Sequence, residues 1–130
     1  MKKKKCEGII FTLFKYNTLI FNKINNLFFN KMNSTEIRRK VLLSGQSALL
    51  GQIYPSIRGI AIGFSGTEKL KLVCYLDREP DEEDYENISL VTTYICADIK
   101  FSKAEEICIY SKEPFRNLDS LNAWVYMRKE

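Results

Sequence analysis

Two β-rich runs joined by a short turn constrain the fold of this chain more than any other feature. The stretch SIRGIAIGFSGTEKLKLVCYLD, residues 56–77, places a Ser-Gly-Thr-Glu turn between two runs of strand-forming residues. Apolar residues alternate along both runs, at Ile60, Ile62 and Phe64 before the turn and at Leu70, Leu72, Cys74 and Leu76 after it. Alternation with a period of two around a Gly-containing turn is typical of a β-hairpin, so we predict one here.

A helix is predicted before the hairpin, from about Ser34 to Leu50. Apolar and small residues recur there at helical spacing, namely Ile37, Val41, Ser44 and Ala48. Asn33 or Ser34 can cap the start of this helix, and Glu36 is placed to complete a capping box. Gly51 suits the C-terminal end, and a proline four residues later favours an extended segment.

A second helix is predicted after the hairpin, with Pro80 in its first turn and its end near Asp98. Its apolar stripe comprises Tyr85, Ile88, Val91 or Thr92, Ile95 and Ile99. Two further β runs, residues 105–112 and 121–129, are joined by EPFRNLDS, which contains several turn-forming residues. The predicted order of elements is therefore αββαββ.

This order most simply gives an α+β fold, in which two helices pack on one face of a four-stranded antiparallel sheet. A chain of 130 residues normally forms one domain around a single core. We assign that single domain to residues 32–130.

The first 31 residues are treated separately. They begin like a signal peptide, with a lysine cluster followed by apolar residues. Lysines and asparagines interrupt every apolar run well before the roughly 18 residues that a membrane span needs, and no small-residue cleavage site follows. We interpret residues 1–31 as a poorly ordered or non-native extension upstream of a start at Met32; an amphipathic surface helix is the alternative.

The net charge of +4 is unevenly distributed along the chain. The first 31 residues contain seven lysines and one glutamate, whereas residues 32–130 contain 13 basic and 15 acidic residues. A nucleic-acid-binding protein concentrates Lys and Arg on one face or element, but the densest charge run here is acidic. We therefore expect no nucleic-acid partner and no membrane partner.

The cysteines indicate the compartment. Cys6, Cys74, Cys96 and Cys108 lack CxxC spacing, and the chain has no histidine to complete a zinc site or activate a thiol. Three of the four lie in apolar segments, so we interpret the cysteines as small buried thiols of a cytoplasmic protein.

An acidic segment, residues 77–86, contains seven carboxylates opposed by one arginine. It lacks the ligand spacing of a calcium loop, and acids in the first turn of a helix are already explained by the helix dipole. This segment has three possible interpretations: a solvated helix start, a protein docking surface or a divalent-metal site. We expect no metal site.

Catalytic machinery is not recognisable. Without histidine, a general base near neutral pH would have to be a perturbed Glu, Asp, Lys or Cys, and the chain contains no nucleophile elbow, Walker loop or HExxH motif. We predict that the protein is not an enzyme and needs no cofactor.

Aromatic residues suggest a second surface. If Leu121, Ala123 and Val125 face the helices, an outward patch on the sheet would consist of Tyr75, Tyr110, Trp124 and Tyr126. Exposed Tyr and Trp are frequent at the centres of protein interfaces. The alternative is that these rings cover the sheet or lie in the core. RNA stacking would require nearby Lys and Arg, which are sparse.

The body of the chain resembles a family of small bacterial immunity proteins, associated with contact-dependent inhibition and colicin-type toxins. The resemblance covers about residues 33–127 and rests on SALLGQIYPSIRGIAIGF, LVCYLDREPDEEDYENIS and TTYICADI. Its pattern positions are Leu49, Leu50, Gly51, Pro55, Ile57, Arg58, Asp77, Pro80, Asp84, Glu86, Ala97 and Asp98.

The resemblance implies a non-catalytic protein that neutralises a cognate toxin, expected to be a basic nuclease, by blocking its active surface. Acidic residues would speed capture, and aromatic anchors would slow release. The predicted partner-binding residues are Asp77, Glu79, Asp81, Glu82, Glu83, Asp84, Glu86, Tyr75, Tyr110, Trp124 and Tyr126. Homodimer formation is left open. The alternatives are a small enzyme or nucleic-acid-processing subunit that uses the acids with a divalent metal, and a structural or adaptor domain.

Overall fold

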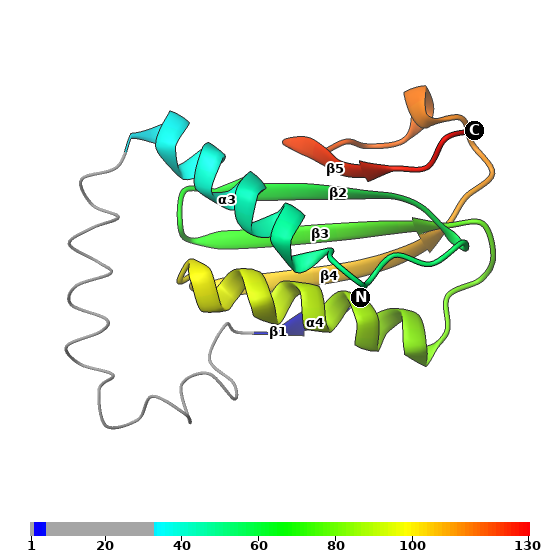
Figure 1. Ribbon diagram of the computed structural model, residues 1–130, viewed down its shortest axis with the longest axis horizontal. Coiled ribbons are helices and arrows are strands. Elements are labelled where there is room, and N and C mark those ends of the chain that lie inside the picture. Colours follow the sequence, from blue (N-terminus) through cyan, green and yellow to red (C-terminus); the bar gives the residue numbers. More distant parts are fainter. Residues whose placement is uncertain (1, 5–32) are drawn as a thin grey trace.

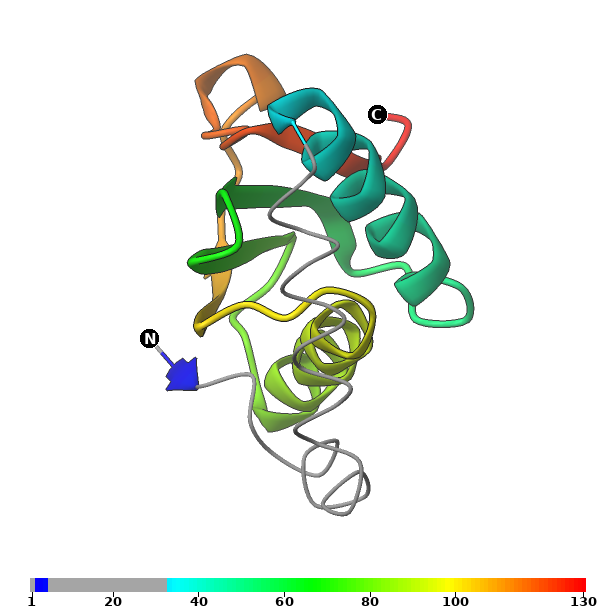
Figure 2. The same cartoon turned by 90° about the vertical axis from the view of Figure 1, so that its left-hand side faces the viewer.

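The computed structural model describes residues 2–4 and 33–130, which form a mixed five-stranded sheet with two helices on one side (Figures 1 and 2). The strands lie in the order β1-β4-β3-β2-β5. Their bounds are Lys2–Lys4 (β1), Ile57–Ser65 (β2), Lys69–Leu76 (β3), Lys103–Tyr110 (β4) and Ala123–Met127 (β5). The helices are α3, Ser34–Ala48, and α4, Glu82–Asp98, and a 3-10 turn, η1, covers Phe115–Asn117. The α+β class and the packing of both helices on one face are as predicted.

The predicted hairpin is formed by β2 and β3, which pair antiparallel from Ile57 opposite Leu76 to Ser65 opposite Lys69. The turn is closed by a 3.0 Å hydrogen bond from the Glu68 amide to the Ser65 carbonyl. Gly66, at the first central position, has a φ of +53°, a left-handed conformation that Gly adopts without the steric penalty of a side chain. This conformation and the hydrogen bond from Glu68 to Ser65 close a tight turn between the two strands.

The sheet is mixed, so the prediction of a wholly antiparallel sheet is wrong. β4 pairs with β3 in parallel, from Lys69 opposite Lys103 to Leu76 opposite Tyr110. The 17 residues of α4 span about 25 Å at 1.5 Å per residue, and the eight residues of β3 span about 26 Å. The helix therefore returns the chain to the start of β3, and the next strand runs in the same direction.

The helix termini largely follow the sequence signals. The Asn33 side chain caps α3 by accepting a 2.9 Å hydrogen bond from the Glu36 amide. Helix α4 begins with a capping box formed by Asp81 and Asp84. Pro80 precedes the cap residue Asp81, so the prediction that it occupies the first turn is wrong by two positions, because the Asp81 carboxylate provides the stronger start signal.

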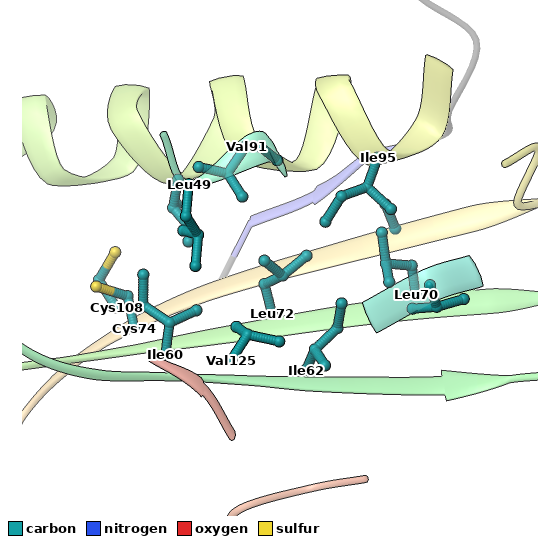
Figure 3. Close-up of a cluster of buried hydrophobic side chains, with 14 of the residues drawn as sticks. Leu49, Ile60, Ile62, Leu70, Leu72, Cys74, Val91, Ile95, Cys108 and Val125 are labelled. Carbon is teal, nitrogen blue, oxygen red and sulfur yellow. The ribbon is translucent and has the colours of Figure 1, made fainter. Parts of the chain in front are cut away.

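The main core lies between the helices and the sheet (Figure 3). Val91 and Ile95 of α4 point toward the strands, where they meet alternate residues of the hairpin. The fully buried residues shared among these elements include Ile60, Ile62, Leu70, Leu72, Val91 and Ile95. Alternation along β2 and β3 thus places one set of apolar side chains against the apolar stripe of the helix.

A smaller apolar cluster covers the opposite face of the sheet. It contains Ala61, Val73 and Tyr75, and partly buried residues of the connection between β4 and β5 pack against it, including Leu118 and Leu121. Residues of the connection between β4 and β5, residues 111–122, therefore cover part of this face, whereas Ile109 of β4 remains exposed.

Two of the four cysteines are the buried thiols that the sequence predicted. Cys74 and Cys108 lie opposite each other in β3 and β4. Their mutual hydrogen bond, together with burial, raises the pKa of the Cys74 thiol. Cys96 is half-buried on α4 and takes part in a disulfide, so the expectation of a free thiol is wrong at this position.

The boundary at Met32 stays a prediction, because residues 1 and 5–32 lie outside the described residues. Lys2–Lys4 form β1, which pairs antiparallel with β4 at the edge of the sheet. In the part of the chain that the structure describes, no helix combines the length and the apolar character needed to cross a bilayer.

Candidate functional site

The acidic segment, residues 77–86, connects β3 to α4 and forms the first turn of that helix. Its seven carboxylates fall into two groups. Three of them, Asp77, Asp81 and Asp84, are engaged in contacts within the protein. The other four project from the surface, so the segment combines a structural anchor with a free negative surface.

Asp84 is the anchor, with 1% of its surface exposed. Arg78 binds its carboxylate with both terminal nitrogens, at 2.6 Å from Nη1 to Oδ2 and 3.0 Å from Nη2 to Oδ1. The Asp81 amide donates a 2.8 Å hydrogen bond to Oδ2, and the Tyr54 hydroxyl donates one to Oδ1. Every lone-pair direction of a buried carboxylate must be satisfied in this way to offset desolvation.

These contacts keep Asp84 ionised. Burial by itself raises the pKa of Asp84, but hydrogen bonds from Arg78, Tyr54 and the Asp81 amide outweigh it and lower the pKa from 3.8 to about 2. The same network raises the pKa of Tyr54, first through burial and then through its bond to Asp84. An efficient general base has a pKa near the operating pH, so a carboxylate with a pKa of about 2 is better suited to a structural role.

Asp77 fastens the start of the segment, and Asp81, in the middle of the segment, caps the helix. Asp81 accepts a 3.0 Å hydrogen bond from the Asp84 amide, which completes the capping box. Asp77 forms a 2.7 Å ion pair with Arg128, which also donates a 2.8 Å hydrogen bond to the Pro55 carbonyl. The acidic segment is therefore tied to the residues that follow β5.

The four remaining acids, Glu79, Glu82, Glu83 and Glu86, are exposed. Their carboxylates form no ion pair or hydrogen bond among the described residues. Helix α4 carries five acidic residues and no basic one. Their charges are consequently available to an external positive surface.

The described residues contain no group of three or more His, Cys, Asp or Glu side chains arranged to hold a metal ion. The most buried acid, Asp84, already directs both oxygens at protein donors. The acids of the first turn point outward around a helix, and they do not converge on one point.

The predicted aromatic residues do not form one open patch; the alternative, in which the rings cover the sheet or lie in the core, describes Tyr75, Trp124 and Tyr126. Their role in partner binding stays a prediction. Tyr75 is buried, and its hydroxyl donates a 2.8 Å hydrogen bond to the Asp119 carbonyl. Its ring lies 5.6 Å from the Trp124 ring, which meets Phe115 edge to face at 5.4 Å. Tyr110, at the end of β4, is half-buried. Tyr75 and Trp124 hold the covering connection in place.

A β-bulge separates Trp124 from Tyr126. Ile60 pairs with Tyr126 and Ala61 with Trp124, so one step along β2 corresponds to two steps along β5. Trp124 consequently lies with the smaller cluster, and Tyr126 packs against the main core on the opposite face. Strict alternation along the strand, which the sequence prediction assumed, does not hold across a bulge.

Sequence reasoning missed a group of exposed apolar residues in the helical layer. They are Leu50, Ile53, Leu90 and Tyr94. Leu90 and Tyr94 lie on α4, out of phase with the buried stripe at Ile88, Val91 and Ile95. That phase difference is the signal that could have found them, because apolar residues off the buried stripe of an amphipathic helix face solvent.

A basic depression lies between the start of the β4–β5 connection, at Ser111 and Lys112, and the residues that follow β5. It is open, measures about 530 Å³, and is lined by Arg58, Asp77, Ser111, Lys112, Arg128, Lys129 and Glu130. Arg58 is buried and binds the Glu130 carboxylate through Nε at 2.8 Å and Nη2 at 2.7 Å. The hydrogen bond from Arg58 lowers the pKa of Glu130 from 4.5 to about 2. The arginines are thus already neutralised by a carboxylate of the chain.

Comparison with known proteins places this geometry in context. The family model described as MafI2 immunity protein matches residues 38–130, which include the acidic segment, α4 and strands β2 to β5. None of the curated proteins compared with the chain matches it.

Proposed function

We propose that this chain, which belongs to the MafI2 immunity protein family, binds a cognate protein toxin and neutralises it by covering the toxin's active surface. The family match carries this proposal, because it extends over the whole described domain apart from the first turn of α3 and β1. The acidic segment and the outer side of α4 are the surface on which we place the toxin.

The toxin is proposed to be a basic nuclease. A nuclease must attract phosphate groups, so its substrate-binding surface is positively charged. A helix with five acids and no base offers that surface a competing negative partner. Blocking of this kind requires no bond making or breaking by the immunity protein. It agrees with a site whose one buried acid is fully engaged by Arg78, Tyr54 and the Asp81 amide.

The proposed place of action is the cytoplasm of the cell that needs protection, where a nuclease toxin would meet its substrate. We propose no cofactor, nucleic-acid partner or membrane partner. The contact-dependent or bacteriocin-like delivery of the toxin follows from the family resemblance and belongs to the same proposal.

Co-expression tests the proposal. The toxin domain encoded by the neighbouring gene is induced in a bacterial host with or without the full chain, and growth and nucleic-acid integrity are followed. We expect the chain to restore growth and to protect nucleic acid. In vitro, inhibition should saturate at equimolar chain, because a blocking protein acts stoichiometrically. Inhibition by a small fraction of an equivalent would indicate a catalytic activity and contradict the proposal.

A further inference from the structure

The outer face of α4 combines charge with exposed apolar surface. This outer face is defined by Glu83, Glu86, Leu90 and Tyr94, which recur at intervals of three and four residues and therefore lie along one side of the helix. Leu90 is 62% exposed and Tyr94 is 50% exposed. The carboxylates of this face lie nearer the start of the helix, and its apolar side chains lie nearer the end.

A neighbouring segment carries further exposed apolar residues. The Asn87 side chain donates a 3.0 Å hydrogen bond to the Gln52 carbonyl, which fastens the loop after α3 to the middle of α4. Leu50, 80% exposed, and Ile53 lie on that loop on either side of Gln52. The left-handed conformation of Gly51, with a φ of +76°, turns the chain between them. Exposed apolar groups thus come from two segments that the protein holds together.

The helix is held rigidly at the end that carries the acids. The bidentate Arg78–Asp84 pair and the capping box fix its first turn, and the inner stripe is packed against the sheet. A binding face that is ordered before association loses less conformational entropy on binding. Leu90 and Tyr94 are therefore suited to act as anchors, since an exposed aromatic or aliphatic group on a rigid helix can enter a pocket of a partner.

We infer that α4 docks through this outer face into an apolar groove of the cognate toxin that is rimmed by Lys and Arg, with Leu90 and Tyr94 as anchors and Glu83 and Glu86 facing the basic rim. This inference rests on the proposed function and specifies which residues carry it. It moves the anchors from the sheet face, where Tyr75 and Trp124 are occupied with internal packing, to the helical layer.

Charge decides among the occupants of this face. A second copy of the chain would bring the carboxylates of two α4 helices together, and like charges across an interface oppose association. Nucleic acids and anionic membrane surfaces are repelled for the same reason. A protein that presents positive charge around an apolar groove is complementary both to the carboxylates and to the apolar side chains of the outer face.

Binding kinetics of the full chain test the inference. The probe is the catalytically inactivated toxin domain encoded by the neighbouring gene, immobilised on a sensor surface. Leu90→Ala and Tyr94→Ala should each raise the dissociation rate about tenfold or more with little change in the association rate. Leu43→Ala is the matched control, since Leu43 on α3 is 61% exposed, and it should leave both rates unchanged. Unfolding transitions equal to that of the wild type would show that all three variants are folded.

The outcomes distinguish failure of the docking face from failure of the proposed function. If the wild-type chain binds the toxin and the Leu90 and Tyr94 variants bind equally well, the docking face is wrong while the proposed function stands. If Leu43→Ala weakens binding as much as Leu90→Ala, the interface is not centred on α4 and the inference fails. If the wild-type chain does not bind, the proposed function fails and the inference fails with it.

Discussion

Replacement of Asp84 by Asn should destabilise the domain and remove part of its pH dependence. The carboxylate is buried and bound by Arg78, Tyr54 and the Asp81 amide, and together they hold the start of α4. An asparagine of nearly the same shape keeps one acceptor oxygen but removes the charge and turns the other position into a donor. The change therefore isolates the electrostatic part of the network.

The pKa of Asp84 sets the size of the effect. Folding lowers it from 3.8 to about 2, and each tenfold change in proton affinity corresponds to about 1.4 kcal/mol, so ionised Asp84 stabilises the fold by about 2 kcal/mol at pH 7. Asn also leaves Arg78 without its main partner. Since the Arg78 side chain is 40% exposed, water can solvate it. We expect the free energy of unfolding to fall by about 2 to 3 kcal/mol. This is at or below the lower limit of the loss expected when one partner of a fully buried ion pair is removed.

The pH dependence gives the sharper test. A carboxyl group whose pKa is lowered by folding stabilises the protein fully above its unfolded pKa, and this contribution is lost as the pH falls through the folded pKa. The difference in unfolding free energy between wild type and Asp84→Asn should thus shrink by about 2 kcal/mol between pH 5 and pH 2. Urea unfolding followed by circular dichroism measures it at each pH.

Asp81→Asn is the matched control for this experiment. Asn caps a helix about as well as Asp, and the exposed contact of Asp81 with Arg78 at 3.6 Å contributes little. This variant should lie within about 1 kcal/mol of wild type. A constant difference between wild type and Asp84→Asn from pH 5 to pH 2 would refute the assignment of Asp84 as an ionised anchor.

Four further predictions address the surface, the covered face, the first residues and metal binding. Charge reversal at Glu82, Glu83 and Glu86 should lower the association rate with the toxin and weaken its salt dependence; equal rates at two salt concentrations would reduce these acids to a solvated helix cap. Trp124→Ala should lower the unfolding free energy by about 3 kcal/mol through the loss of ring packing, and a variant as stable as wild type would contradict that role. Deletion of residues 1–31 removes the three-residue edge strand β1 but no described member of either apolar cluster, since these members lie within residues 37–126. The melting temperature should therefore stay nearly unchanged, and an insoluble product would overturn this expectation. Calorimetric titration with Mg²⁺, Mn²⁺ and Ca²⁺ should show only weak binding, whereas micromolar affinity would restore the metal hypothesis.

Local signals in the sequence were sufficient to predict the hairpin and the helix starts of the domain. The Ser-Gly-Thr-Glu turn, the alternation on both sides of it and the Asn33 cap each depend on hydrogen bonds or side-chain spacing within a few residues. These interactions are the same in a short peptide as in the fold, so their pattern can be read without knowledge of distant partners. The same holds for the outward orientation of Glu82, Glu83 and Glu86 in the first turns of α4.

The direction of β4 and the sides of the sheet to which the β5 residues point could be determined only from the tertiary structure. Pairing of β4 with β3 in parallel follows from where α4 packs, which is a property of the whole layer. The bulge that assigns Trp124 and Tyr126 to opposite faces is set by the register between β2 and β5, two strands far apart in the chain. Periodicity within a strand cannot reveal a register shift that arises from its partner.

The chain's charge pattern by itself located the acidic segment, but only the tertiary structure decided which of its acids are available to a partner. Asp84 looks like its neighbours in the sequence and is buried because Tyr54, thirty positions away, and Arg78 converge on it. Tyr75 is likewise buried because Leu118, Leu121 and Trp124, from a distant part of the chain, pack on its face of the sheet. Burial is decided by which distant segments cover a residue, and so it cannot be read from the residue and its neighbours alone.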